Sequence, residues 1–410
     1  MATQIFTNIN LLVNTRQTGG FIRGKELSIL PSIENAYLII EDDRISEMGK
    51  MEDCSFVKQG KVLPNYTFVL PCWCDSHTHI VFAGSREEEF LDKIKGLSYQ
   101  EIAAKGGGIL NSAKKLNETS EDELFNEAWK RLDQVSKLGT GAIEIKSGYG
   151  LTLEGELKML RVIKKLKEKS SLKIKSTFLG AHAFPSEYKE NHRGYIDSII
   201  NEMLPVIANE KLADYIDVFC EVGFFSPEEM EAICEAGKNY GLKPKLHVNQ
   251  MNSIGGIESG ISADALSLDH LENLNENEIK LLGGFKGAST LLPTAAFFLR
   301  DDLPPAQSLI SAGAAVTLAS DYNPGSSPSG NMNFVLSLSC IQMKMLPEQA
   351  INAATINGAC AMEIDNDYGS IAMGKKANLI FTKPMPSLAY LPYSFGANLI
   401  DKVMINGSFI

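Results

Sequence analysis

Residues 67–79 have the sequence TFVLPCWCDSHTH, an apolar, β-rich run that ends in two histidines. From here to about residue 321, similar apolar runs alternate with longer stretches of helical period, the pattern of repeated β-α units around a parallel sheet. The eight strand candidates are residues 67–79, 141–148, 173–183, 215–223, 243–250, 263–272, 287–293 and 314–321. Eight such units predict an α/β fold, a closed (β/α)₈ TIM barrel.

The two ends of the chain have a different pattern. Residues 1–66 contain short strands separated by turns, and residues 364–410 return to short β segments with glycine turns. We therefore expect a barrel over residues 67–363 and a small composite β domain formed by both ends together. Within the barrel, Ser120 and Glu123 have the spacing of a capping box and predict the start of a helix.

The composition limits the class of protein. The chain has 410 residues, 44% of them hydrophobic, and a formal net charge of -11, so most of its surface would repel a phosphate backbone. We expect no nucleic-acid partner. The first residues lack the pattern of an export signal and no long uncharged apolar stretch occurs, which predicts a soluble, cytoplasmic protein without a membrane partner.

Seven cysteines, an odd number spread over a long chain, do not indicate a disulfide scaffold and fit a reducing compartment. Cys72 and Cys74 could form a thiolate pair on a metal ion. No second thiolate pair with metal-site spacing follows them, so packing is the simpler interpretation.

Polar side chains that can bind metal or move protons recur at the ends of the predicted strands. In such a barrel, reactive groups sit at the C-terminal ends of the strands. Five of the six histidines and one aspartate fall there; they are His77, His79, His182, His247, His270 and Asp321. Only His192 lies elsewhere. His247 could be a core histidine with a backbone partner, and Asp321 a helix-capping or turn carboxylate, but the common phase of all these residues in a repeating unit favours a site.

The H-T-H triplet at residues 77–79 is the strongest element of this site. Residues two apart on a strand point the same way and can place two imidazoles on one ion. With His247 and Asp321, the triplet forms a donor set suited to zinc or iron. Strand 215–223 contains no lysine that could bridge two metals, so we expect one ion per subunit. Lys146 is the only inward candidate, and such a lysine is more often a paired or solvated charge.

Longer motifs, spread over nearly the whole chain, carry a family resemblance. Residues 71–90 (PCWCDSHTHIVFAGSREEEF), 141–160 (GAIEIKSGYGLTLEGELKML) and 318–332 (LASDYNPGSSPSGNM) resemble the amidohydrolase superfamily, and within it the cyclic amidohydrolases that open an imidazolone ring. H-T-H followed by A-G-S-R-E-E-E-F, and D-Y-N-P-G-S, are far more specific than a bare H-x-H.

The resemblance implies ligands, a substrate and an assembly. The metal ligands would be His77, His79, His247 and Asp321. The substrate would be 4-imidazolone-5-propanoate, hydrolysed to N-formimidoyl-L-glutamate in histidine degradation. The substrate contacts would be Arg86, Tyr149, His182, Asn323, Gly325 and Ser326. Arg86 could clamp the propionate with two charged hydrogen bonds, or it could be a surface residue paired with a glutamate at 87–89. Gly325 and Ser326 could be simple turn residues. A homodimer is expected by the same resemblance.

The expected reaction assigns three further roles. One metal ion can activate water and stabilise charge on the carbonyl oxygen. We expect Asp321 to take the proton of that water, and His270 to steady the oxyanion or orient the water. Related deaminases carry a glutamate where this chain has Gln250; a neutral amide cannot shuttle protons, so Gln250 is expected to position the substrate. A deaminase of a nitrogen heterocycle and a non-catalytic binding barrel are the alternatives.

Overall fold

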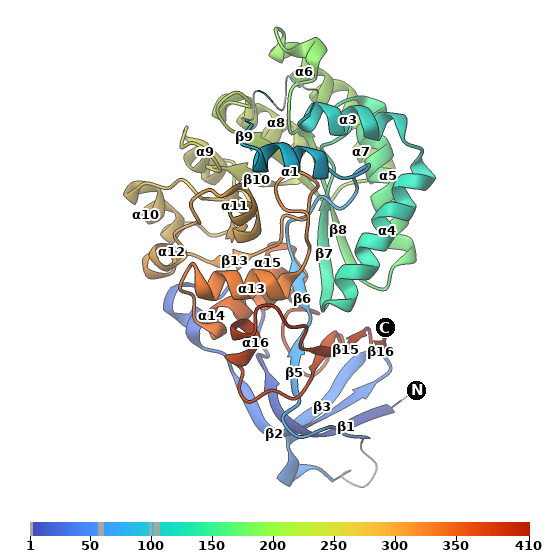
Figure 1. Cartoon of the computed structure of the whole chain (residues 1–410), viewed down its shortest axis with the longest axis vertical. Helices are drawn as coiled ribbons and strands as arrows, with labels where there is room; N and C mark the ends of the chain where they lie inside the picture. The colour runs from blue at the N-terminus through green and yellow to red at the C-terminus, as the bar shows by residue number, and fades with distance from the viewer. Residues whose placement is uncertain (1–2, 56–60, 98–100, 102–106) are drawn as a thin grey trace.

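The computed structural model describes residues 3–55, 61–97, 101 and 107–410, and contains two eight-stranded sheets. Figure 1 shows the parallel sheet and its helices in the upper part of the molecule, and a second sheet, built from both ends of the chain, below it. We call them the barrel sheet and the terminal sheet. The first strand of the terminal sheet begins at Thr3 and its last strand ends at Phe409, so it joins the first and the last strands that the structure describes.

The barrel sheet consists of parallel strands that follow one another in chain order. They are β6 (Trp73–Asp75), β7 (Thr140–Lys146), β8 (Lys173–Ala181), β9 (Tyr215–Cys220), β10 (Lys243–Val248), β11 (Ser267–His270), β12 (Ala288–Leu291) and β13 (Val316–Leu318). Nearly all of their residues are buried, as expected for strands that are covered on both faces. A parallel bridge between Thr78 and Tyr322 brings the last strand back to the first. The predicted barrel is confirmed, because each of the eight predicted ranges overlaps one of these strands.

The first predicted range, residues 67–79, contains two strands rather than one. β5 (Phe68–Pro71) pairs with strands of the terminal sheet, and only β6 belongs to the barrel. The chain changes sheets between adjacent amides: the Cys72 N–H donates to the Asn378 carbonyl at 3.0 Å, and the Trp73 N–H donates to the Gly139 carbonyl at 2.9 Å. Both strands are buried, so a continuous apolar run hides the exchange of partners.

Helices cover the outside of the barrel (Figure 1). They are α1 (Glu87–Ile94), α3 (Ile109–Glu118), α4 (Glu121–Lys137), α5 (Leu153–Lys169), α6 (His192–Ser198), α7 (Leu204–Glu210), α8 (Pro227–Asn239), α9 (Gly256–Ser262), α10 (Glu276–Gly284), α11 (Pro293–Leu299), α12 (Ala306–Ala312), α13 (Met332–Ile341), α14 (Pro347–Asn352), α15 (Gly358–Ala361) and α16 (Tyr390–Tyr393). π-Helical turns at Ile199–Met203 and Ala353–Asn357 continue α6 into α7 and α14 into α15, and 3₁₀ turns lie at Gly24–Ser28, Met51–Asp53 and Ser186–Tyr188.

Local signals at the helix ends agree with the sequence. The predicted start at Ser120 is confirmed, because its side chain accepts the Glu123 N–H and caps α4. Among the described residues, no helix combines the length and the apolar character that a bilayer span requires.

The terminal sheet joins the two ends of the chain. Its strands are β1 (Thr3–Val13), β2 (Ser32–Glu41), β3 (Arg44–Lys50), β4 (Lys61–Val62), β5, β14 (Leu379–Thr382), β15 (Ile400–Ile405) and β16 (Ser408–Phe409). Phe6, Leu38, Leu379 and Met404, which come from four of these strands, share one buried apolar cluster. No aspartate, glutamate, lysine or arginine is buried in any of these strands.

Candidate metal centre and active site

Three histidines from separate parts of the chain meet at the C-terminal ends of the barrel strands. His77 and His79 follow β6 and His247 lies in β10; their exposed fractions are 0%, 2% and 3%. Their ligand nitrogens all lie within 4.8 Å of one another. Asp321, which follows β13, places Oδ1 3.5 Å from Nε2 of His77 and 3.4 Å from Nε2 of His79. The four residues that were predicted as metal ligands therefore converge.

A short turn after β13 holds Asp321 in this position. The Asp321 N–H donates to the His77 carbonyl at 3.0 Å. Asn323 Oδ1 accepts the N–H groups of Gly325 and Ser326, both at 2.8 Å, and Asn323 Nδ2 donates to the Asp321 carbonyl at 2.7 Å. Ser326 Oγ lies 3.2 Å from Asp321 Oδ2 and donates to it. Three of the predicted substrate contacts thus also form the turn that orients the carboxylate.

Two buried aspartates orient the histidines, and the sequence reasoning missed both. Asp269 on β11 lies 2.6 Å from Nδ1 of His77, and Asp217 on β9 lies 2.8 Å from Nδ1 of His247. A hydrogen bond at Nδ1 fixes the tautomer and leaves Nε2 free to act as a ligand. Each aspartate is the single acidic residue of a short, fully buried strand, the one signal that could have pointed to it.

Below the histidines, Lys146 is a paired charge, one of the two alternatives that the sequence left for it. Its Nζ lies 2.8 Å from both Glu144 Oε1 and Asp217 Oδ2, and 3.7 Å from Asp269 Oδ2. Lys245 binds the other oxygen of Glu144. Burial opposes the charge of Lys146, but Asp217 and Glu144 outweigh it and raise its pKa. The lysine is therefore a protonated counter-ion for the carboxylates that hold the histidines.

Burial sets the protonation states within the cluster. It lowers the pKa of His77, His79 and His247 well below the usual value, and the positive charges nearby lower it further. Burial also raises the pKa of Asp321 to about 6. Neutral imidazoles have the free lone pair that metal coordination requires.

His270 ends β11 beside the cluster, together with an acidic residue that the sequence analysis did not select. Its ring centroid lies 5.2 Å from that of His247 and 5.8 Å from that of His77. Its Nδ1 lies 3.4 Å from Oε1 of Glu272. Burial alone would lower the pKa of His270, but Glu272 outweighs it and the pKa is raised. Glu272 lies two residues after the predicted strand-end histidine, and this short spacing is the signal that could have pointed to it.

Two more predicted substrate contacts line the same space. Tyr149, after β7, has its ring centroid 6.0 Å from that of His79 and 5.5 Å from that of His182. His182 follows β8, stacks on His79 with centroids 5.6 Å apart, and hydrogen-bonds through Nδ1 to the Gly148 carbonyl at 2.9 Å. Burial lowers the pKa of His182 to about 4. His192 lies outside, half-exposed on α6 and stacked on Phe184.

Arg86 immediately precedes α1, and its side chain reaches the site. Its Nε donates to Ser112 Oγ at 2.8 Å, and its Cζ lies 5.9 Å from the centroid of the Tyr149 ring. Nη2 is buried and has no hydrogen-bond partner among the described residues. A Cβ on Gly325 would come within 2.4 Å of Arg86 Nη1, so the glycine makes room for the guanidinium. A buried donor that lacks a partner is a ready site for an anionic group.

Gln250 lies on the loop that follows β10, the strand that carries His247. Its backbone carbonyl accepts Nδ2 of Asn273 at 2.6 Å, which ties this loop to the one after β11. The residue is partly buried.

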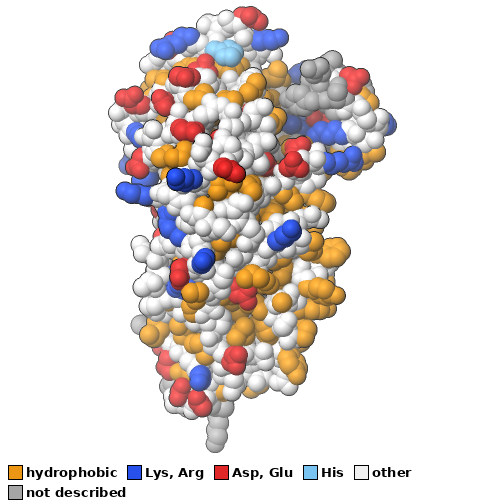
Figure 2. All heavy atoms as spheres, turned by 90° about the vertical axis from the view of Figure 1, so that its left-hand side faces the viewer, with side chains coloured by type: hydrophobic (Ala, Val, Ile, Leu, Met, Phe, Trp, Pro, Cys, Tyr) orange, Lys and Arg blue, Asp and Glu red, His pale blue; other side chains and the backbone are white. Residues whose placement is uncertain are grey.

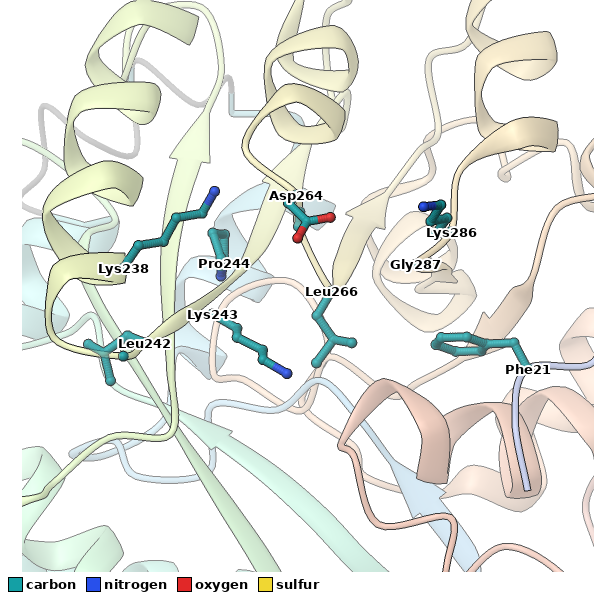
Figure 3. A pocket seen from close by; sticks show the side chains of 11 residues that line it. Phe21, Lys238, Leu242, Lys243, Pro244, Asp264, Leu266, Lys286 and Gly287 are labelled. Atoms are coloured by element: carbon teal, nitrogen blue, oxygen red, sulfur yellow. The ribbon is translucent and has the colours of Figure 1, made fainter. Parts of the chain in front are cut away.

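The opposite end of the barrel has a hollow of a different kind (Figure 3). It has a volume of about 470 Å³ and lies at the N-terminal ends of β10, β11 and β12. Lys238, Lys243 and Lys286 line it, and Lys243 is paired with Glu363. It contains neither a histidine nor a cluster of metal ligands, so we assign the chemistry to the other end.

The cysteines take no part in the site. None of the seven, all of which lie in the described part of the chain, forms a disulfide. Burial raises the pKa of Cys74 to about 12 and that of Cys72 well above the usual value, as expected for thiols packed in the interior. Neither belongs to the group of possible metal ligands found among the described residues.

Comparisons with known proteins agree with this geometry. The amidohydrolase family model matches residues 159–410. Among solved structures, the guanine deaminase of E. coli has a TM-score of 0.71 at 14% identity, over 100% of this chain and 99% of that one. An atrazine chlorohydrolase from Arthrobacter aurescens, complexed with zinc, has a TM-score of 0.70 at 14% identity, over 99% of this chain and 94% of that one. The fold and the histidine site thus define a hydrolase of the metal-dependent amidohydrolase class.

Curated relatives narrow the assignment. The imidazolonepropionase of Flavobacterium johnsoniae is 58% identical over 99% of both chains, and that of Christiangramia forsetii is 53% identical over 100% of both. The imidazolonepropionase of Clostridium tetani is 42% identical over 94% of this chain and 93% of its own. The chain belongs to the imidazolonepropionase family.

Proposed function

We propose that this chain hydrolyses the ring amide of 4-imidazolone-5-propanoate to N-formimidoyl-L-glutamate, a step of histidine degradation. The observation that carries the proposal is the meeting of His77, His79, His247 and Asp321, all buried, at the end of the barrel that Arg86 also reaches. This donor set favours a hydrolase over a binding protein, because a barrel kept only for binding would not need four metal ligands.

The donor set fits one metal ion per subunit, zinc or iron. Three imidazole nitrogens and a carboxylate oxygen are ligands that both metals accept, so the residues alone do not choose between them. The ion would supply an activated water and polarise the ring carbonyl. Metal analysis of protein purified without chelators identifies it.

The remaining roles belong to residues of the chain. Asp321, held by the turn at residues 323–326, receives the proton of the attacking water and passes it to the ring nitrogen that leaves. His270 hydrogen-bonds the oxyanion or the water from the adjacent strand. Gln250 hydrogen-bonds the substrate, since its amide can neither accept nor release a proton at neutral pH.

Recognition of the propionate falls to Arg86. Its unpartnered Nη2 gives the substrate carboxylate a charged donor, and Tyr149 and His182 pack beside the ring. Asn323, Gly325 and Ser326 contact the substrate at the edge of the same turn.

The direct test is an assay with freshly prepared imidazolone propionate, followed by the loss of ring absorbance. Ring opening without release of ammonia is the expected result. Ammonia release with an intact ring would instead make the chain a deaminase of a nitrogen heterocycle. Asp321→Asn should lower turnover about 1000-fold or more, because it removes the proton acceptor; normal turnover in this variant would exclude Asp321 as the base.

Arg86→Met tests substrate recognition separately. Loss of charged hydrogen bonds to the propionate should raise KM about 10- to 100-fold and leave the metal content unchanged. Arg193→Met, on the exposed face of α6, is the matched control and should behave like the wild type. An unchanged KM in Arg86→Met would remove the arginine from the binding site.

We further propose a homodimer in the reducing cytoplasm. Figure 2 shows hydrophobic side chains gathered along one side of the molecule. Phe297, Ile341, Leu346, Tyr393 and Phe395, on or next to α11, α13, α14 and α16, are each more than half exposed. A second copy would cover this apolar surface. Light scattering of the wild type and of Phe395→Asp tests this; a monomeric wild type would contradict it.

A further inference from the structure

The loop that carries Gln250 brings an amide to the barrel mouth, while the neighbouring loop brings a carboxylate. Opening a ring amide requires protons to move and charge on the carbonyl oxygen to be stabilised. Gln250 cannot exchange a proton. Glu272, two residues past the end of β11, is a carboxylate at the same edge, and none of the roles above uses it.

The backbone bends sharply to place this carboxylate. His270 and Leu271 have φ angles of 85° and 67°, two consecutive residues other than glycine in the left-handed region. Such strain persists only where the surroundings enforce it. The turn brings Glu272 back against His270, so that Oε1 lies 3.4 Å from Nδ1 and both side chains are 3% exposed.

This pair repeats the arrangement of the two proposed ligand pairs. Asp269 meets His77 and Asp217 meets His247 at the same ring atom, Nδ1. In each case the carboxylate accepts the Nδ1 proton and turns Nε2 away from itself. Of the three histidines in these pairs, only His270 is not proposed as a ligand, so its Nε2 is available to the substrate.

The second oxygen of Glu272 is a further sign of function. Oε2 is buried and has no hydrogen-bond partner among the described residues. A buried acceptor without a donor is unfavourable and rare in native proteins. A substrate N–H or a water that arrives with the substrate would satisfy it, whereas a purely structural carboxylate would be saturated by the protein.

We propose that Glu272 is a positioning residue for ring opening: it accepts the Nδ1 proton of His270 and holds Nε2 of that ring toward the substrate carbonyl. This inference rests on the proposed function. It assigns the hydrogen bond to the substrate carbonyl to the Glu272–His270 pair, beside the amide of Gln250.

The experiment compares Glu272→Leu, which removes the acceptor, with Glu272→Gln, which keeps an acceptor oxygen. In the zinc-loaded enzyme, Glu272→Leu should lower kcat about 10- to 100-fold, as losses of such supporting partners do, with KM changed less than about twofold. Glu272→Gln should retain more of kcat than Glu272→Leu. Glu276→Leu, exposed at the start of α10, is the matched control and should match the wild type.

A double variant tells a positioning role from an independent one. In the His270→Ala background, Glu272→Leu should cause no further loss of kcat, because its effect passes through the imidazole. A wild-type kcat in Glu272→Leu, or a loss that adds to that of His270→Ala, would overturn the proposal.

Nuclear magnetic resonance gives a readout that does not depend on turnover. In zinc-loaded protein labelled with ¹⁵N-histidine, the signals of His270 are those that disappear in His270→Ala. The wild type should carry a proton on Nδ1 of His270, and Glu272→Leu should shift the ring toward the other tautomer. An unprotonated Nδ1 in the wild type would refute the proposal even in an active enzyme. An inactive wild type with the expected tautomer would refute the proposed function instead.

Discussion

The barrel sheet and the terminal sheet each have eight strands, yet their interiors differ. The terminal sheet buries apolar side chains such as Phe6 and Leu38. The barrel buries charged ones as well: Glu144, Lys146 and Asp269 are fully buried in β7 and β11. Burial of apolar surface stabilises a fold directly, whereas a buried charge is unfavourable unless a partner compensates it.

The difference shows what each sheet is for. The charges at the centre of the barrel compensate one another, and the chain of contacts leads from Lys146 through Asp217 and Asp269 to His247 and His77. These buried charges lower the stability of the fold, but they hold the imidazoles in place. Such a conflict between stability and position is expected at a functional site. The terminal sheet contains no such chain and acts as a base for the barrel.

The largest expected effect comes from breaking the charge network. Among the described residues, Lys146 is the only lysine or arginine within 4 Å of Asp217, so Lys146→Met leaves buried carboxylates uncompensated. The free energy of unfolding should fall by about 3–5 kcal/mol, the usual result of removing one partner of a buried pair. Urea unfolding followed by circular dichroism measures the change.

Lys137→Met is the matched control for this variant. Lys137 is 62% exposed and pairs with Asp133 across one turn of α4. Its replacement should change the free energy of unfolding by no more than about 0.5 kcal/mol. If Lys146→Met is as stable as the control, the barrel interior is not held by its charges and the contrast with the terminal sheet fails.

The second effect belongs to the terminal sheet. Leu38→Ala opens a cavity in the cluster that contains Phe6 and Met404, and should lower the free energy of unfolding by about 2–5 kcal/mol. Because no site residue lies in this sheet, kcat and KM at 25 °C should match the wild type. Leu38→Met, which keeps the volume, should cost less than about 1.5 kcal/mol. A large drop in kcat in the folded Leu38→Ala protein would show that the terminal sheet does more than support the barrel.

The same contrast explains what the sequence could predict. Apolar runs of β character identified all eight barrel strands, because a buried parallel strand has that pattern whatever its partner. The strand-end rule then selected five of the six histidines, and these five meet at one end of the barrel, whereas His192, which the rule left out, lies elsewhere. These predictions depend on chain order and on chemistry that each residue carries by itself.

Partner choice was beyond reach from one sequence. The run at 67–79 divides into β5 and β6 because adjacent amides bond to different sheets, and apolarity is the same on both sides of the division. Asp217 and Asp269 are the single carboxylates of their strands, and their role depends on which imidazole lies opposite. Glu272 depends on two left-handed residues before it, which the residue types do not indicate.

The smallest expected effect compares two aspartates at β9, one that supports a proposed metal ligand and one that does not. Asp217 lies inside β9 and meets His247, whereas Asp214 lies just before the strand and binds Lys167 and Ser176 near the other end of the barrel. Asp217→Asn should weaken zinc binding about 10- to 100-fold, because the amide holds the imidazole less firmly and lowers its basicity. Competition with a chelator measures the affinity. Asp214→Asn should leave zinc affinity unchanged, since its partners do not contact a histidine. Equal affinities in the two variants would mean that the carboxylate on Nδ1 does not support the ligand, and the charges inside the barrel would then need another explanation.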